Sequence, residues 1–301
     1  MTLHLDRELV EPLLTWPGVI HAIDVGHAAT APRVDDTLLR RGGDSLLSRA
    51  AWVDGLGSLV KTATVFPGNA ADGLATVNGS VALFSDRTGE LDCTLDFHLI
   101  TKWKTAADSA LAAGRLARAD SERILIVGSG TVASSMIDAY RSLFPSARFD
   151  VWSRTASNAD ALAEAAGADR ADDLETAVRR ADVVCTATMS NDPVIHGSWL
   201  HPGQHVDLIG GYRPDMREAD DECIGRSSVF VDSLMTARDV GDIARPLEAG
   251  VITESDVCDY SALHSGGFAR TSDDEITLFK NAGGAHLDLM VARHMYQIAT
   301  A

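Results

Sequence analysis

The order of apolar and polar positions predicts a strand-rich segment followed by a helix in the N-terminal part of the chain. Residues 38–53, 57–66, 79–86 and 90–97 combine apolar and β-branched residues, and a Thr-Gly turn separates the last two. A helix is predicted over residues 101–118, where Ala106, Ala110 and Ala113 share one face. Thr101 is expected to cap this helix, and a second element must pack closely on the alanine face.

Strands then alternate with helices from residue 123 onward. The sequence predicts strands at 124–130, 149–154, 181–188 and 205–211, helices at 131–144 and 158–167, and a last helix in the tail from about residue 277. Because these strands are apolar on both faces, the pattern favours a parallel sheet covered by helices on both sides. The predicted fold class is therefore α/β, with a doubly wound, Rossmann-type domain over residues 119–283 and a strand-rich α+β part before it.

The glycine-rich segment at the first of these strands carries the signature of a dinucleotide site. An apolar strand ends and a helix opens across Gly128, Ser129, Gly130, Thr131, Val132 and Ala133. The first glycine permits a tight turn, the second lets a pyrophosphate approach the backbone, and the helix N-terminus offers free N–H groups. Thr186 and Thr188, at the end of a later strand, are expected near the nicotinamide ribose, although a structural role suits them equally. A purely structural glycine turn is the alternative for the whole segment.

The tip of the second Rossmann strand indicates which dinucleotide is bound. An NAD-binding protein usually has Asp or Glu there, which accepts from the ribose hydroxyls. This chain has Ser153, Arg154 and Thr155, a guanidinium flanked by two hydroxyls, and this set suits the 2′-phosphate of NADP(H). Asp150 is the one rival acid, but it lies back within the strand. NADP(H) is therefore the predicted cofactor; NAD(H) is the alternative if Arg154 is only a solvated surface residue.

Composition and charge exclude several classes of partner. The formal net charge is −17 and no run of Lys or Arg offsets it, so neither nucleic acid nor an anionic membrane is an expected partner. No apolar run approaches the ~18 residues of a transmembrane helix, and acids in the N-terminal segment argue against a secretion signal. The four cysteines lack paired spacing and the histidines are dispersed, so we expect reduced thiols, a cytoplasmic location and no metal site. A protein this acidic must gather cations or helix N-termini locally if it binds an anion.

Several motifs, in the right order, resemble the ornithine cyclodeaminase/mu-crystallin family over nearly the whole chain. They are LVKTATVFPGN, GLATVNGSVALF, ITKWKTAADSALAAGRLAR, VCTATMSNDPV and HVDLIGGYRPDMREAD. The resemblance implies a homodimer that reduces or interconverts imino acids, its small-molecule substrates, with a nicotinamide cofactor. It also implies that residues 1–118 and the C-terminal helix 284–301 form a substrate-binding and dimerisation domain, in addition to the Rossmann domain 119–283.

The resemblance points to cations that would bind the substrate. Lys61 corresponds to the family's active-site lysine; it shares a strand face with apolar residues, and half-burial would make its proton easier to donate. Arg33 corresponds to an arginine that grips the substrate carboxylate, with Arg49 as a competitor for this role. Lys104 stands where the family has arginine, so the positive charge survives without the bidentate fork. The predicted helix places Lys104 in its first turn, where free N–H groups also favour an anion.

A departure from the family pattern favours one branch of the family. Cyclodeaminases carry a catalytic aspartate where this chain has Tyr212, and tyrosine is a poor base for cyclising ornithine, unless Asp215 substitutes for it. The GxxRPDxRE form resembles the ketimine reductases, which implies NADPH-dependent reduction of 1-pyrroline-2-carboxylate or 1-piperideine-2-carboxylate to proline or pipecolate. The alternatives are an ornithine cyclodeaminase with bound NAD, an alanine- or opine-type dehydrogenase, and a non-catalytic protein that binds NADP and a carboxylated ligand.

Overall fold

The computed structural model describes residues 3–301, and the chain divides into two compact units. Unit 1 comprises the chain up to Lys104 together with Gly284–Ala301, and unit 2 comprises Thr105–Gly283. The first boundary falls inside one continuous helix, α3 (Phe97–Leu116), so no loop marks it in the sequence. The second boundary falls between Gly283 and Gly284, just before the C-terminal helix. None of the helices described in residues 3–301 is long and apolar enough to cross a membrane.

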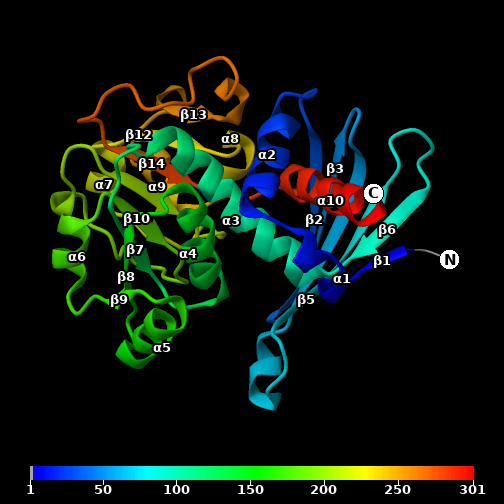
Figure 1. Ribbon diagram of the computed structural model, residues 1–301, viewed down its shortest axis with the longest axis horizontal. Coiled ribbons are helices and arrows are strands. Elements are labelled where there is room, and N and C mark those ends of the chain that lie inside the picture. The colour runs from blue at the N-terminus through cyan, green and yellow to red at the C-terminus, as the bar shows by residue number, and fades with distance from the viewer. Residues whose placement is uncertain (1–2) are drawn as a thin grey trace. The chain divides into compact units, whose positions relative to one another are not determined.

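Unit 1 is built on a six-stranded sheet in the order β1-β6-β5-β4-β3-β2. Neighbouring strands are antiparallel, except for the parallel pair β1 and β6. The C-terminal helix α10 packs on β3, β4 and the helix α2 (Figure 1). The elements of this unit, besides the start of α3, are β1 (Leu3–Leu5), α1 (Arg7–Val10), α2 (Trp16–His27), β2 (Arg33–Arg41), β3 (Asp44–Val53), β4 (Gly57–Val65), β5 (Val77–Phe84), β6 (Leu91–Leu95) and α10 (Ala285–Thr300).

Alternation along the strands gives the sheet of unit 1 one buried face and one exposed face. Leu59 of β4 pairs with Leu83 of β5, and both are fully buried on the face that α10 covers. Trp52 and Val60 point to the other face and expose 51% and 37% of their surface. The period of two along a strand therefore decides which side chains lie under the helix.

Unit 2 contains an eight-stranded parallel sheet in the order β13-β12-β14-β11-β10-β7-β8-β9. From β7 the chain builds outward through β8 to β9 and then returns to β10 and β11, which is the doubly wound Rossmann order. The predicted fold class is thus confirmed. The elements are β7 (Arg123–Val127), α4 (Thr131–Leu143), β8 (Arg148–Trp152), α5 (Ala156–Ala166), β9 (Asp169–Arg170), α6 (Leu174–Arg180), β10 (Val183–Thr186), β11 (His205–Leu208), α7 (Asp221–Gly225), β12 (Ser228–Val231), α8 (Leu234–Ala237), α9 (Gly241–Glu248), β13 (Val257–Asp259) and β14 (Thr277–Lys280).

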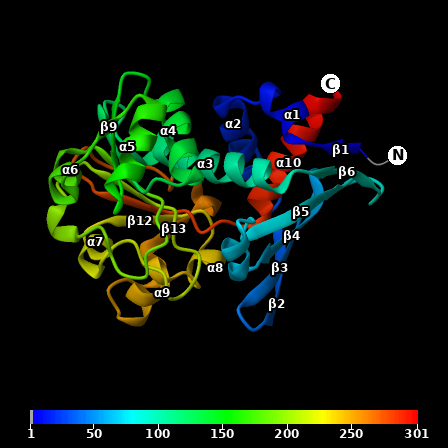
Figure 2. The ribbon, with the colours of Figure 1, turned by 90° about the horizontal axis from the view of Figure 1, so that it is seen from below.

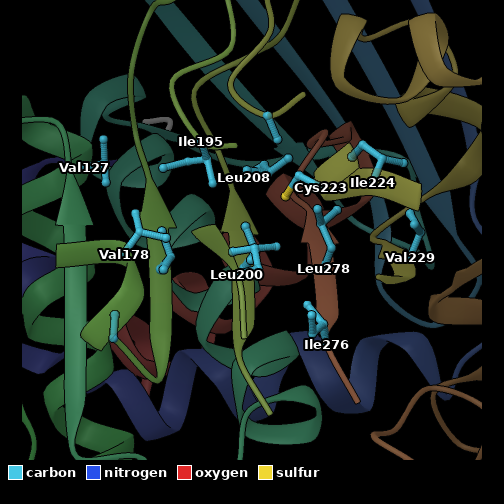
Figure 3. Packing of buried hydrophobic residues seen from close by; sticks show 14 of the residues in the cluster. Val127, Val178, Ile195, Leu200, Leu208, Cys223, Ile224, Val229, Ile276 and Leu278 are labelled. Atoms are coloured by element: carbon cyan, nitrogen blue, oxygen red, sulfur yellow. The ribbon is translucent and has the colours of Figure 1, made fainter. Parts of the chain in front are cut away.

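Helices cover both faces of this parallel sheet, with α4 and α5 on one side and α7 and α9 on the other (Figure 2). On the α7 side, Val127, Leu208 and Leu278 pack with Val178 of α6 and Ile224 of α7 in one apolar cluster (Figure 3). The alternate residues of the same strands are also buried and face the other layer of helices. Burial on both faces explains why the strands are continuous apolar runs in the sequence.

The helix predicted over residues 101–118 begins earlier than the sequence suggested, so the capping role predicted for Thr101 is wrong. α3 starts at Phe97, where the Asp96 carboxylate accepts from the backbone N–H of Leu99 at 2.6 Å, as an N-cap does. The Thr101 hydroxyl lies inside the helix and donates to the carbonyl of Phe97 at 2.7 Å. Lys104 consequently lies beyond the first turn, and the free N–H groups of the helix start are not available to it.

The predicted tail helix from about residue 277 is wrong at its start. Thr277–Lys280 form β14, which pairs with β11 on one side and β12 on the other, and all four of its residues are buried. A short apolar run that is buried on both faces carries no alternation, so periodicity alone does not distinguish it from a helix. The helix itself, α10, begins at Ala285, after Gly283 and Gly284.

Candidate active site

Lys61 lies in a buried and charged setting within unit 1. β4 places it on the sheet face that α10 covers, and only 9% of its side chain is exposed. Its ammonium donates to the Asp288 carboxylate at 2.8 Å and to the Thr101 hydroxyl at 2.8 Å. The same ammonium lies 4.9 Å from the centre of the Phe97 ring. The side chain is therefore held in one direction by a carboxylate, a hydroxyl and an aromatic face.

Two further cations accompany Lys61. Arg49 of β3 is its direct partner in the strand register, and Lys104 of α3 is buried, with 7% of its surface exposed. Both act electrostatically on Lys61 and Asp288. Arg49 also pairs with Asp36 at 2.9 Å, so three cations face two carboxylates here. One positive charge is left over, in a chain whose net charge is −17, and this local excess suits a carboxylate ligand.

The surroundings make Lys61 a better proton donor than an ordinary lysine. Burial lowers the pKa of its ammonium, and the charge of Lys104 adds to this effect, while Asp288 opposes it. Burial alone would raise the pKa of the Asp288 carboxyl, but Lys61 and Lys104 outweigh burial and lower this pKa. Asp288 is therefore ionised beside a lysine that gives up its proton more readily than usual.

Arg33 does not join this cluster in the structure. It begins β2, pairs with Trp52 in the strand register and is exposed. As its register partner, Arg33 points to the same face of the sheet as Trp52. Arg49 lies three positions before Trp52 on β3, and this odd offset puts Arg49 on the opposite face. The structure thus brings together Arg49, Lys61 and Lys104, whereas Arg33 lies on the other face.

Asp288 and Thr101 were not among the residues predicted to form the site. Asp288 lies on α10, far along the chain from Lys61, and only the folding of the tail over the sheet brings the two together. A signal was present in the sequence, because GGAHLDLM places one acid in an otherwise apolar helix start. An acid at an apolar position has to find a cationic partner when it is buried.

The predicted dinucleotide turn lies at the end of β7 and opens α4 in unit 2. Gly128 has a φ of +126°, and a Cβ on it would come within 2.5 Å of the carbonyl oxygen of Ala187. Gly130 is the N-cap of α4, where a Cβ would meet no atom within 4 Å. Thr131 and Val132 follow in the first turn, and the fully buried Ala133 packs the helix against the sheet. The open space at Gly130 and the free helix N-terminus fit a pyrophosphate.

A pocket of about 240 Å³ adjoins this turn at the switch point of the sheet. Its lining residues come from the carboxyl ends of β7, β8 and β10: Gly128, Ser129, Trp152, Ser153, Arg154, Ala187, Thr188, Met189, Ser190 and Val194. In doubly wound sheets this is the place where ligands bind. The residues present therefore fit a nicotinamide dinucleotide.

The tip of β8 contributes three residues that the sequence analysis selected. Ser153 and Arg154 line the pocket, and the Ser153 hydroxyl lies 3.0 Å from the Ser129 hydroxyl. Thr155 is the N-cap of α5. The rival acid Asp150 is buried, and its carboxylate pairs with Arg123 at 2.9 Å. Asp150 is thus neutralised within the strand, away from the tip.

The two threonines after β10 differ in position. Thr186 is fully buried, and its hydroxyl donates to the backbone carbonyl of Asp207 at 3.4 Å, so its contacts are structural. Thr188 lines the pocket. Of the two, only Thr188 reaches the space available to a cofactor.

The loop that follows β11 holds Tyr212 and Asp215 in an exposed position. Arg213 forms a two-pronged ion pair with Asp215, at 2.8 and 2.9 Å, and its guanidinium lies 5.4 Å from the centre of the Tyr212 ring. The hydrogen bonds from Arg213 lower the pKa of the Asp215 carboxyl. A carboxyl bound in this way is a weak base and shapes the loop.

No cluster of three or more metal-binding side chains occurs within residues 3–301. His286, which lies near Lys104 and His27, is buried, and burial lowers its pKa to about 3. It is therefore neutral near pH 7 and adds no charge to the group around Lys61.

Comparison with known proteins identifies the family. The model of the ornithine cyclodeaminase/mu-crystallin family matches residues 26–301. The chain belongs to this family. The predicted resemblance to this family is thus confirmed.

Reductases and a dehydrogenase are among the proteins that are similar to this chain. The chain is 44% identical, over 95% of its length and 93% of the relative's, to the Delta(1)-pyrroline-2-carboxylate reductase of Paracoccus denitrificans. The solved Delta(1)-pyrroline-2-carboxylate reductase of Thermococcus litoralis, in complex with NADH and L-proline, superposes with a TM-score of 0.90 at 26% identity, covering 99% of this chain and 98% of that one. An archaeal alanine dehydrogenase dimer with bound NAD gives 0.91 at 29% identity, covering 99% and 96%.

Proposed function

We propose that this protein is an oxidoreductase that uses a nicotinamide cofactor to reduce a cyclic 2-imino acid. The proposed substrates are 1-pyrroline-2-carboxylate and 1-piperideine-2-carboxylate, which yield proline and pipecolate. The observation that carries the proposal is the buried Lys61–Asp288 pair with its neighbouring cations, in a chain closely similar to a pyrroline-2-carboxylate reductase.

The chemistry adds a hydride to the imine carbon and a proton to the imine nitrogen. The bound nicotinamide cofactor supplies the hydride. Arg49 and Lys104 hold the substrate carboxylate by charge, and Lys61 donates the proton. Asp288 and Thr101 orient the Lys61 ammonium, because each accepts from it at 2.8 Å. Tyr212 has no part in this reaction, since no base is needed to release ammonia.

The first experiment follows cofactor oxidation by the purified protein with the five- and six-membered cyclic imines. Ornithine, and pyruvate with ammonium, serve as the competing substrates for a cyclodeaminase and an alanine dehydrogenase. We expect rapid turnover of the imines and little of the others. Fast conversion of ornithine to proline with no imine reduction would overturn the proposal, and binding of the imine without turnover would indicate a ligand-binding protein.

A lysine variant tests the proton donor. Lys61→Met is expected to lower kcat by about a hundredfold or more, the usual contribution of a general acid, while cofactor affinity is retained. Lys102→Met is the matched control: it removes another cation of unit 1, on α3, whose ammonium is paired with Glu11 at 2.6 Å. If both variants keep full activity, Lys61 is not the donor.

We further propose that NADPH is the preferred cofactor. Support comes from Arg154 and Ser153 at the tip of β8 and from the pairing of Asp150 with Arg123, which leaves no free acid there. Arg154→Asp should weaken NADPH binding far more than NADH binding, because it replaces a cation with an anion that repels the 2′-phosphate. Equal effects on the two cofactors would count against NADPH, and NADH, present in the Thermococcus structure, would then be the natural cofactor.

A homodimer in the cytoplasm completes the proposal. The exposed sheet face of unit 1 carries Leu39, Trp52 and Val60, with 61%, 51% and 37% of their surface exposed, and the similar alanine dehydrogenase is a dimer. Trp52→Glu should shift the mass in light scattering toward the monomer, whereas Leu9→Glu, on α1, should leave it unchanged. A dimeric Trp52→Glu protein would argue against this face. The four free cysteines suit a reducing compartment.

A further inference from the structure

A cluster of buried charged side chains lies in unit 2, near the carboxyl ends of its strands. Glu218, Asp242 and Lys280 each expose none of their surface, and we call them the buried triad. The Lys280 ammonium lies 3.3 Å from one Asp242 oxygen, and the other oxygen accepts from the backbone N–H of Glu218 at 2.7 Å. Imine reduction, as proposed above, uses none of the three. Because burying charges costs free energy, their presence calls for a role.

Glu218 ties together the chain segments that follow two neighbouring strands. One carboxylate oxygen accepts from the backbone N–H and the hydroxyl of Thr188, both at 2.7 Å, just after β10. The other oxygen accepts from the backbone N–H of Gly210 at 2.6 Å, just after β11. A single side chain thus fixes both segments at the carboxyl ends of the strands, where a doubly wound fold binds its cofactor.

The backbone after β11 lies directly on the triad. A Cβ on Gly210 would collide with the Thr188 carbonyl and come within 2.6 Å of a Glu218 oxygen. A Cβ on Gly211 would come within 2.7 Å of an Asp242 oxygen. Only glycine fits at such approaches, so the Gly210–Gly211 pair belongs to the same assembly as the triad.

The hydrogen bond to Glu218 determines what Thr188 can offer to a ligand. A hydroxyl has one hydrogen, and Thr188 donates it to the carboxylate, so toward the pocket that it lines the hydroxyl can only accept. We propose that Glu218, held by Asp242 and Lys280, is a positioning residue that presets Thr188 as an acceptor for a hydrogen-bond donor on the nicotinamide half of the cofactor. A ribose hydroxyl and the carboxamide N–H are donors of this kind.

Lys280 supplies the charge that keeps this arrangement working. Burial raises the pKa of the Glu218 carboxyl, and the charge of Asp242 adds to the effect, while Lys280 opposes it. An ionised Glu218 accepts from all three donors, whereas a protonated one would present a hydrogen to a neighbouring N–H. The lysine therefore favours the form of Glu218 that holds both segments.

The test measures cofactor binding by fluorescence titration in the absence of any imino acid. Glu218→Gln turns an amide N–H₂ toward Thr188 or Gly210, and we expect the Kd for the reduced cofactor to rise on the order of tenfold. Thr188→Ala should raise Kd similarly, Thr188→Ser should retain most of the affinity, and the double variant should be no worse than Thr188→Ala alone. In steady state the cofactor KM should rise more than kcat falls.

Asp182→Asn is the matched control. The Asp182 carboxylate also accepts from two backbone N–H groups, those of Glu122 and Arg123, both at 2.9 Å. These contacts lie at the amino ends of the strands, opposite to the end where Glu218 lies. Asp182→Asn should lower Tm without changing Kd. Unchanged affinity in Glu218→Gln, or additive effects of the two substitutions, would overturn the proposal. If Glu218→Gln does not fold, parental affinity in Thr188→Ala overturns it equally well. The inference rests on the proposed use of a nicotinamide cofactor. Its test measures cofactor binding without an imino acid, so a negative result would leave the proposed imine substrate untouched.

Discussion

Asp288 controls the charge of Lys61, because its carboxylate lies 2.8 Å from the ammonium in a site with almost no access to water. An opposite charge at this distance favours the charged form of a lysine and so raises its pKa. Asp288→Asn removes that support, so the pKa of Lys61, already lowered by burial, should fall further. The proton donor is lost as the pH rises through this pKa. The activity of Asp288→Asn should therefore decline at a lower pH than that of the parent protein.

The measurement is the pH dependence of kcat for imine reduction at saturating cofactor. Asp92→Asn is the control, since Asp92 pairs at 2.7 Å with Arg293 of α10, in the same unit as Lys61. It should leave the position of the basic limb unchanged. Tm recorded at each pH separates loss of the fold from loss of the proton, because an unpaired buried lysine also destabilises the protein. A basic limb that stays in place in Asp288→Asn would show that Asp288 does not set this pKa.

At the scale of elements, the two glycines at the junction between β7 and α4 are required for different reasons. Gly128 needs its backbone conformation, with φ +126° and the Ala187 carbonyl in the way of any Cβ. Gly130 needs only its open space. Gly128→Ala should therefore cost about 1–3 kcal/mol of stability and lower Tm. Gly130→Ala should keep the Tm of the parent but bind cofactor more weakly, because the methyl group occupies the space of the pyrophosphate.

Thermal unfolding with and without cofactor checks both expectations in one experiment. The parent protein and Gly128→Ala should gain Tm on addition of cofactor in proportion to their affinities, and Gly130→Ala should gain the least. Gly114→Ala, at a helix position where a Cβ meets nothing within 4 Å, is the control for glycine replacement as such. A full gain of Tm in Gly130→Ala would place the pyrophosphate elsewhere.

These elements also mark how far the sequence alone can lead. The elements β7, α4, β8, α5, β10 and β11 of the Rossmann unit were predictable, because apolar runs alternate there with amphipathic helices and the glycine turn stands between two of them. β14 was not, since its four residues are buried on both faces and show no period. The start of α3 was misplaced because Thr101 and Asp96 are both good caps, and only the folded backbone selects Asp96.

The site was predictable to the extent that it depends on local motifs. Lys61 and the glycine turn stand in such motifs. The pairing of Lys61 with Asp288 needs α10 to fold over the sheet, and the separation of Arg33 from Arg49 follows from the register of β2 and β3. Contacts of this kind connect distant parts of the chain, so they cannot be predicted from a local sequence pattern.

At the scale of the whole molecule, the response to acid is a balance between buried groups of opposite kind. His205 is fully buried, and burial lowers its pKa from 6.5 to about 3. The unfolded chain binds a proton there before the native state does, so this histidine stabilises the protein above its unfolded pKa and progressively less as the pH falls. Asp207 is also fully buried, and burial raises its pKa from 3.8 to about 7. The native state holds that proton longer, so this carboxyl stabilises the protein at acid pH and less as the pH rises.

Two variants should therefore lose stability with opposite dependence on pH. In His205→Gln the deficit relative to the parent should shrink as the pH falls from about 6 to about 4, by about 1.4 kcal/mol for each unit. In Asp207→Asn, where the amide replaces a carboxyl that accepts from Tyr140 at 2.7 Å, the deficit should shrink as the pH rises over the same window. Urea unfolding at a series of pH values measures both, with exposed His98→Gln as the control. Parallel stability curves for the three variants would mean that neither buried group titrates differently in the folded and unfolded chain, and that acid sensitivity arises elsewhere in the molecule.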